Sequence, residues 1–111
     1  MKYSDEQRLQ KIVQNASALC EYITQSNMKR EDLLTDLHLQ WLVTTPLYNI
    51  GEHVYHLSPE YKKSHDEIQW SMISWLRHRL VHDYDGTNWS IIAEAVFEEL
   101  PVFVRQLQDL I

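Results

Sequence analysis

Hydrophobic residues recur every three or four positions along most of the chain, which is the spacing that gathers them on one face of an α-helix. The first stretch of this kind runs from about Ser4 to Ser26, and Asn27 with the pair Lys29 and Arg30 marks its end. Its apolar positions are Leu9, Ile12, Val13, Ala16, Leu19, Cys20 and Ile23. This stretch predicts an amphipathic helix with a single buried face.

A second stretch, from about Glu31 to Leu57, carries hydrophobic residues on two faces. One face consists of Leu34, Leu37, Trp41, Tyr48 and Tyr55, and the other of Leu39, Leu42, Val43, Leu47, Ile50, Val54 and Leu57. A helix that is apolar on two sides is covered on both. We therefore expect one face in the core, and the other is a candidate subunit interface. Pro46 lacks an amide donor and clashes with the preceding turn, which predicts a kink or an interruption.

A polar connection starts at Ser58 and reaches about Asp66. The third predicted helix then spans roughly Ile68 to Val81 or slightly beyond. Its apolar face is made of Ile73, Leu76 and Leu80. This helix is the one that carries the candidate chemistry of the chain.

A loop over residues 83–87 precedes the fourth helix, which Thr87 or Asn88 can cap. The apolar stripe of that helix is Trp89, Ile92, Ala93, Val96, Leu100, Phe103, Val104, Leu107 and Ile111. Pro101 predicts a bend within it. With only two glycines and three prolines in 111 residues, the chain has too few turn residues for a β-rich domain. The sequence predicts an all-α fold, an antiparallel up-down bundle of four main helices forming a single domain over residues 1–111, with the second and fourth helices bent at prolines.

The charge and the single cysteine narrow the possible surroundings and partners. A formal net charge of −6 argues against a protein that coats nucleic acid, so any such contact should be focal. No apolar run is long enough to span a bilayer, and the N-terminus lacks the apolar stretch of a signal peptide. Cys20 has no partner for an internal disulfide, so we expect a cytoplasmic protein without a membrane partner. At its helical position, Cys20 is expected to be a small core residue.

The residues that point to chemistry are Arg77, His82 and Tyr84, which form the pattern R-x4-H-x-Y. A guanidinium is permanently charged and matches the geometry of a phosphate, and an imidazole exchanges protons near neutral pH. On a regular helix, Arg77 and His82 lie about 140° apart around the axis. They could therefore act on one phosphate only if the helix unwinds near His82 or a second copy of the chain completes the site.

Structural interpretations of the same residues remain open. Arg77 could pair with a carboxylate, His82 could be a polar cap, and Tyr84 could pack at an interface. Glu52 is expected to be buried and to need a partner, which could be Arg77 or Arg79, and the alternative is a partly exposed helix carboxylate.

Two further patterns have ordinary explanations. The pairs His53-x2-His56 and His78-x3-His82 have spacings that could share a metal, but neither has a clear third ligand in the sequence. The four tryptophans could stack on bases, although their helical spacing favours the core for most of them: Trp41, Trp70, Trp75 and Trp89.

R-x4-H-x-Y near the end of a third helix resembles the HEPN superfamily, and nearly the whole chain looks like its HepT-like toxins. The supporting residues are Ile50-Gly51-Glu52, Trp70, Leu80-Val81-His82-Asp83-Tyr84 and Leu100-Pro101. The position after the arginine is often asparagine in that family and is His78 here, which leaves the details of substrate contact open.

The resemblance implies a homodimer in which two such motifs form a composite cleft that cleaves RNA without metal or other cofactor. Arg77 would bind the scissile phosphate and His82 would be the general acid or base. His78, Arg79 and Glu52 would support RNA binding. DNA lacks the attacking 2′-hydroxyl and should resist.

The resemblance also implies a partner, an MntA-like nucleotidyltransferase antitoxin, which would transfer AMP from ATP to Tyr84 and silence the toxin. Two rival functions remain. The bundle could be a non-catalytic module that docks and regulates a nucleotidyltransferase, or a helical protein that binds a metal.

Overall fold

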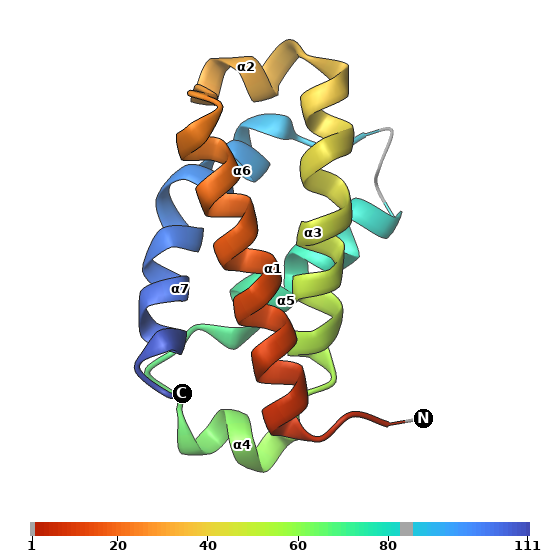
Figure 1. Cartoon of the computed structure of the whole chain (residues 1–111). Coiled ribbons are helices and arrows are strands. Elements are labelled where there is room, and N and C mark those ends of the chain that lie inside the picture. The colour runs from red at the N-terminus through yellow and green to blue at the C-terminus, as the bar shows by residue number, and fades with distance from the viewer. Residues whose placement is uncertain (1, 83–85) are drawn as a thin grey trace.

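The computed structural model describes residues 2–82 and 86–111, with the backbone alone described at 81 and 82. Figure 1 shows four long helical runs that alternate in direction along the bundle. They are α1 (Asp5–Gln25), α3 (Leu37–Tyr55), α5 (Trp70–His82), and a last run built of α6 (Trp89–Glu94), the π-helical turn η1 (Ala95–Glu99) and α7 (Leu100–Gln108). No strand occurs in the described ranges, and the predicted all-α antiparallel bundle is confirmed.

Helix α1 begins and ends within one residue of its predicted bounds because polar side chains close both ends. The Ser4 hydroxyl accepts a hydrogen bond from the backbone N–H of Gln7 (3.1 Å), and the Gln7 side chain accepts one from the backbone N–H of Ser4 (2.9 Å). This reciprocal capping box satisfies two amides that the helix leaves open. After Ser26, Asn27 adopts a left-handed conformation (φ 57°) that turns the chain away from the helix axis.

The second predicted helix is divided in two, and the division is at Asp36 and not at Pro46. The short helix α2 (Arg30–Thr35) crosses one end of the bundle, and α3 starts directly after Asp36 (Figure 1). The Asp36 carboxylate accepts hydrogen bonds from the backbone amides of His38 (2.9 Å) and Leu39 (3.3 Å), so it caps a new helix. Pro46 lies inside α3, which continues through it.

The two predicted faces of α3 have different environments. The sequence did not say which face is the core; it is the one whose residues are mostly buried: Val43, Leu47, Ile50, Val54 and Leu57. On the other face, Leu37 is 50%, Trp41 52% and Tyr55 54% exposed within the described residues. One face of α3 therefore lies in the core, and the role of the other as a subunit interface stays a prediction.

The polar connection predicted from Ser58 contains a further helix, α4 (Pro59–Ser64), which closes the other end of the bundle (Figure 1). Ser58 caps it by accepting from the backbone N–H of Tyr61 (3.1 Å), and proline is favoured in a first helical turn. Asp5 holds this corner, since its carboxylate accepts from the Ser58 amide (2.9 Å) and hydroxyl (2.6 Å). The ends of α1 and α4 are thereby joined.

The last helical run is capped by Asn88, whose side chain accepts from the backbone N–H of Ser90 (3.1 Å). It passes through the π-turn η1 directly before Pro101, where the sequence predicted a bend. Proline removes an amide donor and crowds the carbonyl four residues earlier. A wider π-turn just before Pro101 accommodates both effects.

One hydrophobic core runs through the bundle and is supplied by all four runs. Helix α3 packs against both α1 and α5, and α7 closes the bundle against α1. Cys20 is half-buried beside this core, as expected, and burial raises the pKa of its thiol. The thiol therefore stays protonated at neutral pH.

Candidate active site

Helices α3 and α5 touch through their backbones at Gly51, directly opposite Arg77. A Cβ atom placed on Gly51 would lie 2.7 Å from the Cβ of Arg77 and 2.9 Å from its backbone nitrogen. Real side chains do not approach each other so closely, so only glycine fits there. This contact fixes where the Arg77 side chain leaves α5. The sequence stretch that includes Gly51 supported the family resemblance, but its packing role was not predicted.

The Arg77 side chain extends from α5 onto α3, where it meets two groups. Its Nε donates to the Glu52 carboxylate, which confirms the expected pairing of Glu52 with an arginine. Its guanidinium carbon lies 4.5 Å from the ring centre of Tyr55, a cation–π distance. Arg77 and Glu52 are 28% and 33% exposed, so the pair is reachable from solvent and the expectation that Glu52 is buried is wrong. A guanidinium has five N–H donors, and Arg77 can hold Glu52 on one edge while meeting a ligand on another.

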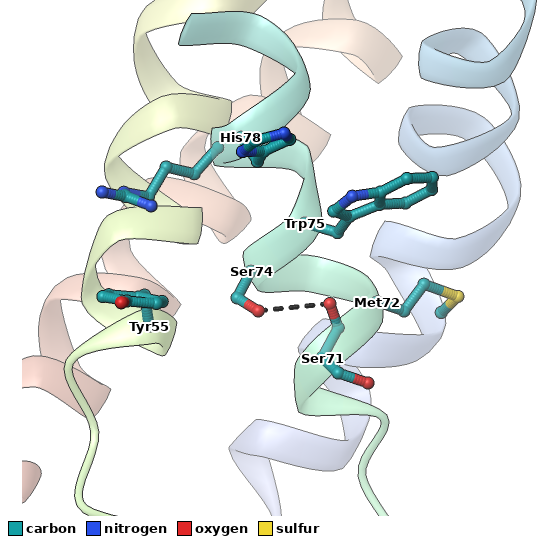
Figure 2. Close-up of a pocket in the computed structure, with 7 residues that line it drawn as sticks. Tyr55, Ser71, Met72, Ser74, Trp75 and His78 are labelled. Carbon is teal, nitrogen blue, oxygen red and sulfur yellow. Dashed lines mark hydrogen bonds between the residues drawn. The ribbon is translucent and has the colours of Figure 1, made fainter. Parts of the chain in front are cut away.

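Arg77 stands on the wall of an open groove of about 750 Å³ between α3 and α5. Figure 2 shows Tyr55 on one side of this groove, Trp75 and Met72 on the other, and His78 at one end. Ser71 and Ser74 lie between the two sides. A guanidinium, an imidazole, two aromatic rings and two hydroxyls therefore face one space.

Arg79 points to the other side of α5, where its guanidinium carbon lies 4.1 Å from the ring centre of Trp75. Its Nε is buried and makes no hydrogen bond within the described part of the chain. Arg79 therefore supports the groove through Trp75. It does not pair with Glu52, which was the second partner considered for that carboxylate.

The expectation that most tryptophans lie in the core is correct for Trp70, which is 5% exposed, and wrong for Trp41 and Trp75, each 52% exposed. Trp70 has a buried partner for its indole N–H, because its Nε1 donates to the backbone oxygen of His65 (3.0 Å). Trp41 and Trp75 lie on faces of α3 and α5 that no other part of the described chain covers. Helical spacing alone cannot distinguish those faces from core faces.

The two remaining motif residues, His82 and Tyr84, are described less fully than Arg77. The backbone of α5 is helical through His82, while the side chain of His82 and residues 83–85 lie outside what the structure describes. Both alternatives, a helix that unwinds near His82 and a second copy that completes the site, therefore stay predictions. Tyr84 lies outside the described residues, and its predicted role stays a prediction.

A second polar cluster surrounds His53 on the side of α3 that faces α1. Arg8 Nη1 lies 3.1 Å from His53 Nδ1, and the Tyr3 ring stands edge-on to the imidazole. An arginine can only donate, so Nδ1 accepts and the ring is neutral. Burial first, and then the charges of Arg8 and Lys11, hold the pKa of His53 below its ordinary value.

Of the two histidine pairs considered as metal ligands, His53 with His56 lies within the described residues, whereas the His82 side chain of the other pair lies outside them. Within residues 2–82 and 86–111, no group of three or more histidine, cysteine or acidic side chains could hold a metal ion. His56 Nε2 lies 3.7 Å from the Glu52 carboxylate on the same helix. Across the same ranges, no helix is both long and apolar enough to cross a membrane.

Comparison with known proteins agrees with this arrangement. Residues 6–110 match the family model described as "Ribonuclease HepT-like". A protein of Caldanaerobacter subterraneus subsp. tengcongensis that is named a putative RNase is 30% identical over 103 residues, which cover 93% of this chain and 90% of that protein. A protein of Thermococcus cleftensis, named "Probable ribonuclease HepT", is 29% identical over 110 residues, covering 99% and 98%. No solved structure gives a significant match. The chain belongs to the HepT-like ribonuclease family.

Proposed function

We propose that this protein is a ribonuclease toxin that cleaves RNA without a metal ion, with Arg77 and His82 as its catalytic residues. The observation that carries the proposal is the setting of Arg77. Its guanidinium is held between a carboxylate and an aromatic ring on the wall of an open groove, within the motif that gives the family resemblance. A positioned cation of this kind stabilises the charge that develops on a phosphate during cleavage.

In the proposed reaction, the ribose 2′-oxygen attacks the adjacent phosphorus and the bond from phosphorus to the 5′-oxygen breaks. The 2′-hydroxyl loses a proton and the leaving 5′-oxygen gains one. His82 performs proton transfer at this centre, and Arg77 binds the non-bridging oxygens. The products are a 2′,3′-cyclic phosphate and a 5′-hydroxyl, so a DNA strand of the same sequence is not a substrate.

The geometry of α5 supports a homodimer as the active form. Positions five apart on a regular helix lie about 140° apart around its axis, and the backbone of α5 is helical through His82, so we infer that a second copy brings the two groups to one phosphate. Two copies related by a two-fold axis bring the Arg77 of one near the His82 of the other. The exposed apolar stripe on the outer face of α2 and α3, with Leu34, Leu37 and Trp41, is the proposed interface.

The cleavage test compares wild type with Arg77→Ala and His82→Ala on labelled RNA in the presence of a chelator. Wild type should cleave, and each variant should lose at least about a hundred-fold in rate, as is usual for general acid–base and electrostatic groups. Arg105→Ala and His38→Ala, both on the exposed surface, are matched controls and should cleave like wild type. A wild type without activity, or variants as active as wild type, would refute the proposal.

We further propose that a nucleotidyltransferase antitoxin silences the enzyme at Tyr84. The phenol oxygen would attack the α-phosphorus of ATP, pyrophosphate would leave, and the phenol proton would pass to a base. AMP so close to His82 adds negative charge and bulk where RNA must bind. Incubation with ATP and a partner nucleotidyltransferase should add the mass of AMP to wild type and not to Tyr84→Phe. An equal mass gain in both proteins would remove Tyr84 from this role.

A further inference from the structure

The groove at Arg77 continues along α5 beyond the catalytic arginine. The space of about 750 Å³ beside Arg77 shares Tyr55, Ser71 and Ser74 with a second hollow of about 620 Å³. The second hollow reaches Lys62 and Asp66. Together they form an elongated trough that is long for a single phosphate, and each part has the volume of a small-molecule site.

Two half-exposed aromatic rings border the trough. Tyr55 is 54% and Trp75 is 52% exposed, and Figure 2 places them on opposite sides of the serine hydroxyls. Each ring already has an arginine near it, Arg77 at 4.5 Å from the Tyr55 centre and Arg79 at 4.1 Å from the Trp75 centre. Rings that combine with guanidinium groups in this way are the surfaces on which unpaired bases stack.

Cations stand at both ends of the trough. Arg77 lies at one end, paired with the Glu52 carboxylate, and Lys62 lies in the second hollow together with Asp66. The Lys62 ammonium donates to the backbone oxygen of Tyr55 (3.2 Å), which holds this cation near α3. Two cations set apart along one groove suit a ligand with phosphates at intervals, as a nucleic-acid strand has.

We propose that this trough binds single-stranded RNA, with one base stacked on Tyr55 and another on Trp75. The scissile phosphate lies at Arg77, and a phosphate farther along the strand lies at Lys62. This assignment rests on the proposed function, because it takes the phosphate at Arg77 from it. Tyr55 and Trp75 are then residues that select unpaired RNA, since bases inside a duplex do not offer their faces.

The test measures binding apart from cleavage, in a His82→Ala background that keeps the trough intact. The probe is a short, unstructured, fluorescently labelled RNA, and its anisotropy gives the affinity. Tyr55→Leu and Trp75→Leu should each weaken binding roughly ten-fold or more, the usual effect of removing one stacking platform. Tyr55→Phe and Trp75→Phe keep a ring and should restore most of the affinity. Tyr22→Leu, an equally aromatic and exposed position on α1, should leave it unchanged.

RNA with abasic positions gives a second measurement. An abasic nucleotide at the stacking position should weaken RNA binding by the His82→Ala protein. It should cause no further loss of affinity in the variant whose matching ring, Tyr55 or Trp75, is already replaced by leucine. Unchanged affinity in both leucine variants would overturn the inference, even if wild type cleaves RNA. Ring-dependent binding by a protein that never cleaves would refute the proposed function and leave the RNA site standing. Leucine variants that become monomeric but bind RNA with the affinity of the background protein would show that a second copy covers the rings, which also overturns the inference.

Discussion

At the scale of single residues, three separate contacts hold Arg77 in place. The backbone contact with Gly51 fixes its Cα, the Glu52 carboxylate takes Nε, and the Tyr55 ring supports the guanidinium plane. A flexible side chain held at three points loses little conformational entropy when it binds a phosphate. Such preorganisation lowers the free energy needed to reach the transition state.

Removing the charge of Glu52 should therefore reduce the rate of RNA cleavage. Glu52→Gln keeps the shape and an acceptor oxygen but weakens a charge-assisted hydrogen bond, which should lower kcat/KM roughly ten-fold. Steady-state cleavage of a labelled RNA measures the change, and Glu60→Gln on the exposed surface of α4 is the control. Activity equal to wild type would mean that Glu52 does not position Arg77.

The lowered pKa of His53 predicts how stability depends on pH. The folded protein holds this imidazole neutral beside Arg8, whereas the unfolded chain protonates it near the ordinary histidine pKa of 6.5. Between the folded pKa and 6.5, the unfolded state binds more protons than the folded state does. The stabilisation from the neutral His53 is therefore fully present above pH 6.5 and is lost as the pH falls toward the folded pKa. His53→Gln should show a smaller drop in Tm between pH 7.5 and pH 5.5 than wild type.

His38→Gln supplies the control for that comparison, because the His38 side chain is 85% exposed. Its Tm should fall with pH as the Tm of wild type does. An identical pH dependence in wild type and His53→Gln would contradict the predicted linkage.

At the scale of elements, the contact between α3 and α5 is the one that aligns the site. Gly51→Ala would place a methyl group 2.7 Å from the Arg77 Cβ, and a backbone neighbour at 2.9 Å cannot move aside as a side chain can. The helices must separate, which should destabilise the fold by about 1–3 kcal/mol. Tm should fall by roughly 4–8 °C for each kcal/mol, and cleavage at a temperature well below Tm should also fall because Arg77 moves.

Thr45→Ala is the matched control on the exposed side of α3 and should change neither Tm nor cleavage. A Gly51→Ala protein with the Tm and activity of wild type would show that the two helices can adjust without cost.

The elements that the sequence predicted well are those with local signals. The spacing of apolar residues fixed α1 within one residue, and Pro101 marked the irregular last run. The break at Asp36 was missed because the apolar pattern continues across it, while the cap that causes it needs one carboxylate oriented toward two amides. The exposure of Trp75 and the fit at Gly51 depend on which helices become neighbours, and no local pattern contains that information.

At the scale of the whole molecule, the exposed stripe on α2 and α3 has the character of an interface. Leu34 on α2 is 43% exposed, and Leu37 and Trp41, one turn apart on α3, are 50% and 52% exposed. Large apolar side chains gathered on one face of a small protein usually meet a partner. In the proposed homodimer, a second copy bound to this face would complete the site of Arg77 and His82.

Trp41→Glu should therefore dissociate the proposed homodimer. A buried tryptophan is a frequent hot spot of interfaces, and its loss should raise the dimer Kd roughly 30-fold or more. Analytical ultracentrifugation measures the shift, and cleavage should fall in parallel at low protein concentration. Tyr22→Glu on α1 is the control and should leave the assembly unchanged. A Trp41→Glu protein that stays dimeric would place the interface elsewhere.

Because of the contact at Gly51, core side chains should be able to change during evolution without affecting the position of Arg77. Main-chain atoms of two helices set the position of Arg77, so core side chains such as Leu47 and Ile73 can be exchanged without moving the guanidinium. A library randomised at core positions should return many active sequences, whereas one randomised at position 51 should return glycine. The core residues can then diverge widely in sequence, while the alignment of α3 with α5 at Gly51, and with it the position of Arg77, stays the same.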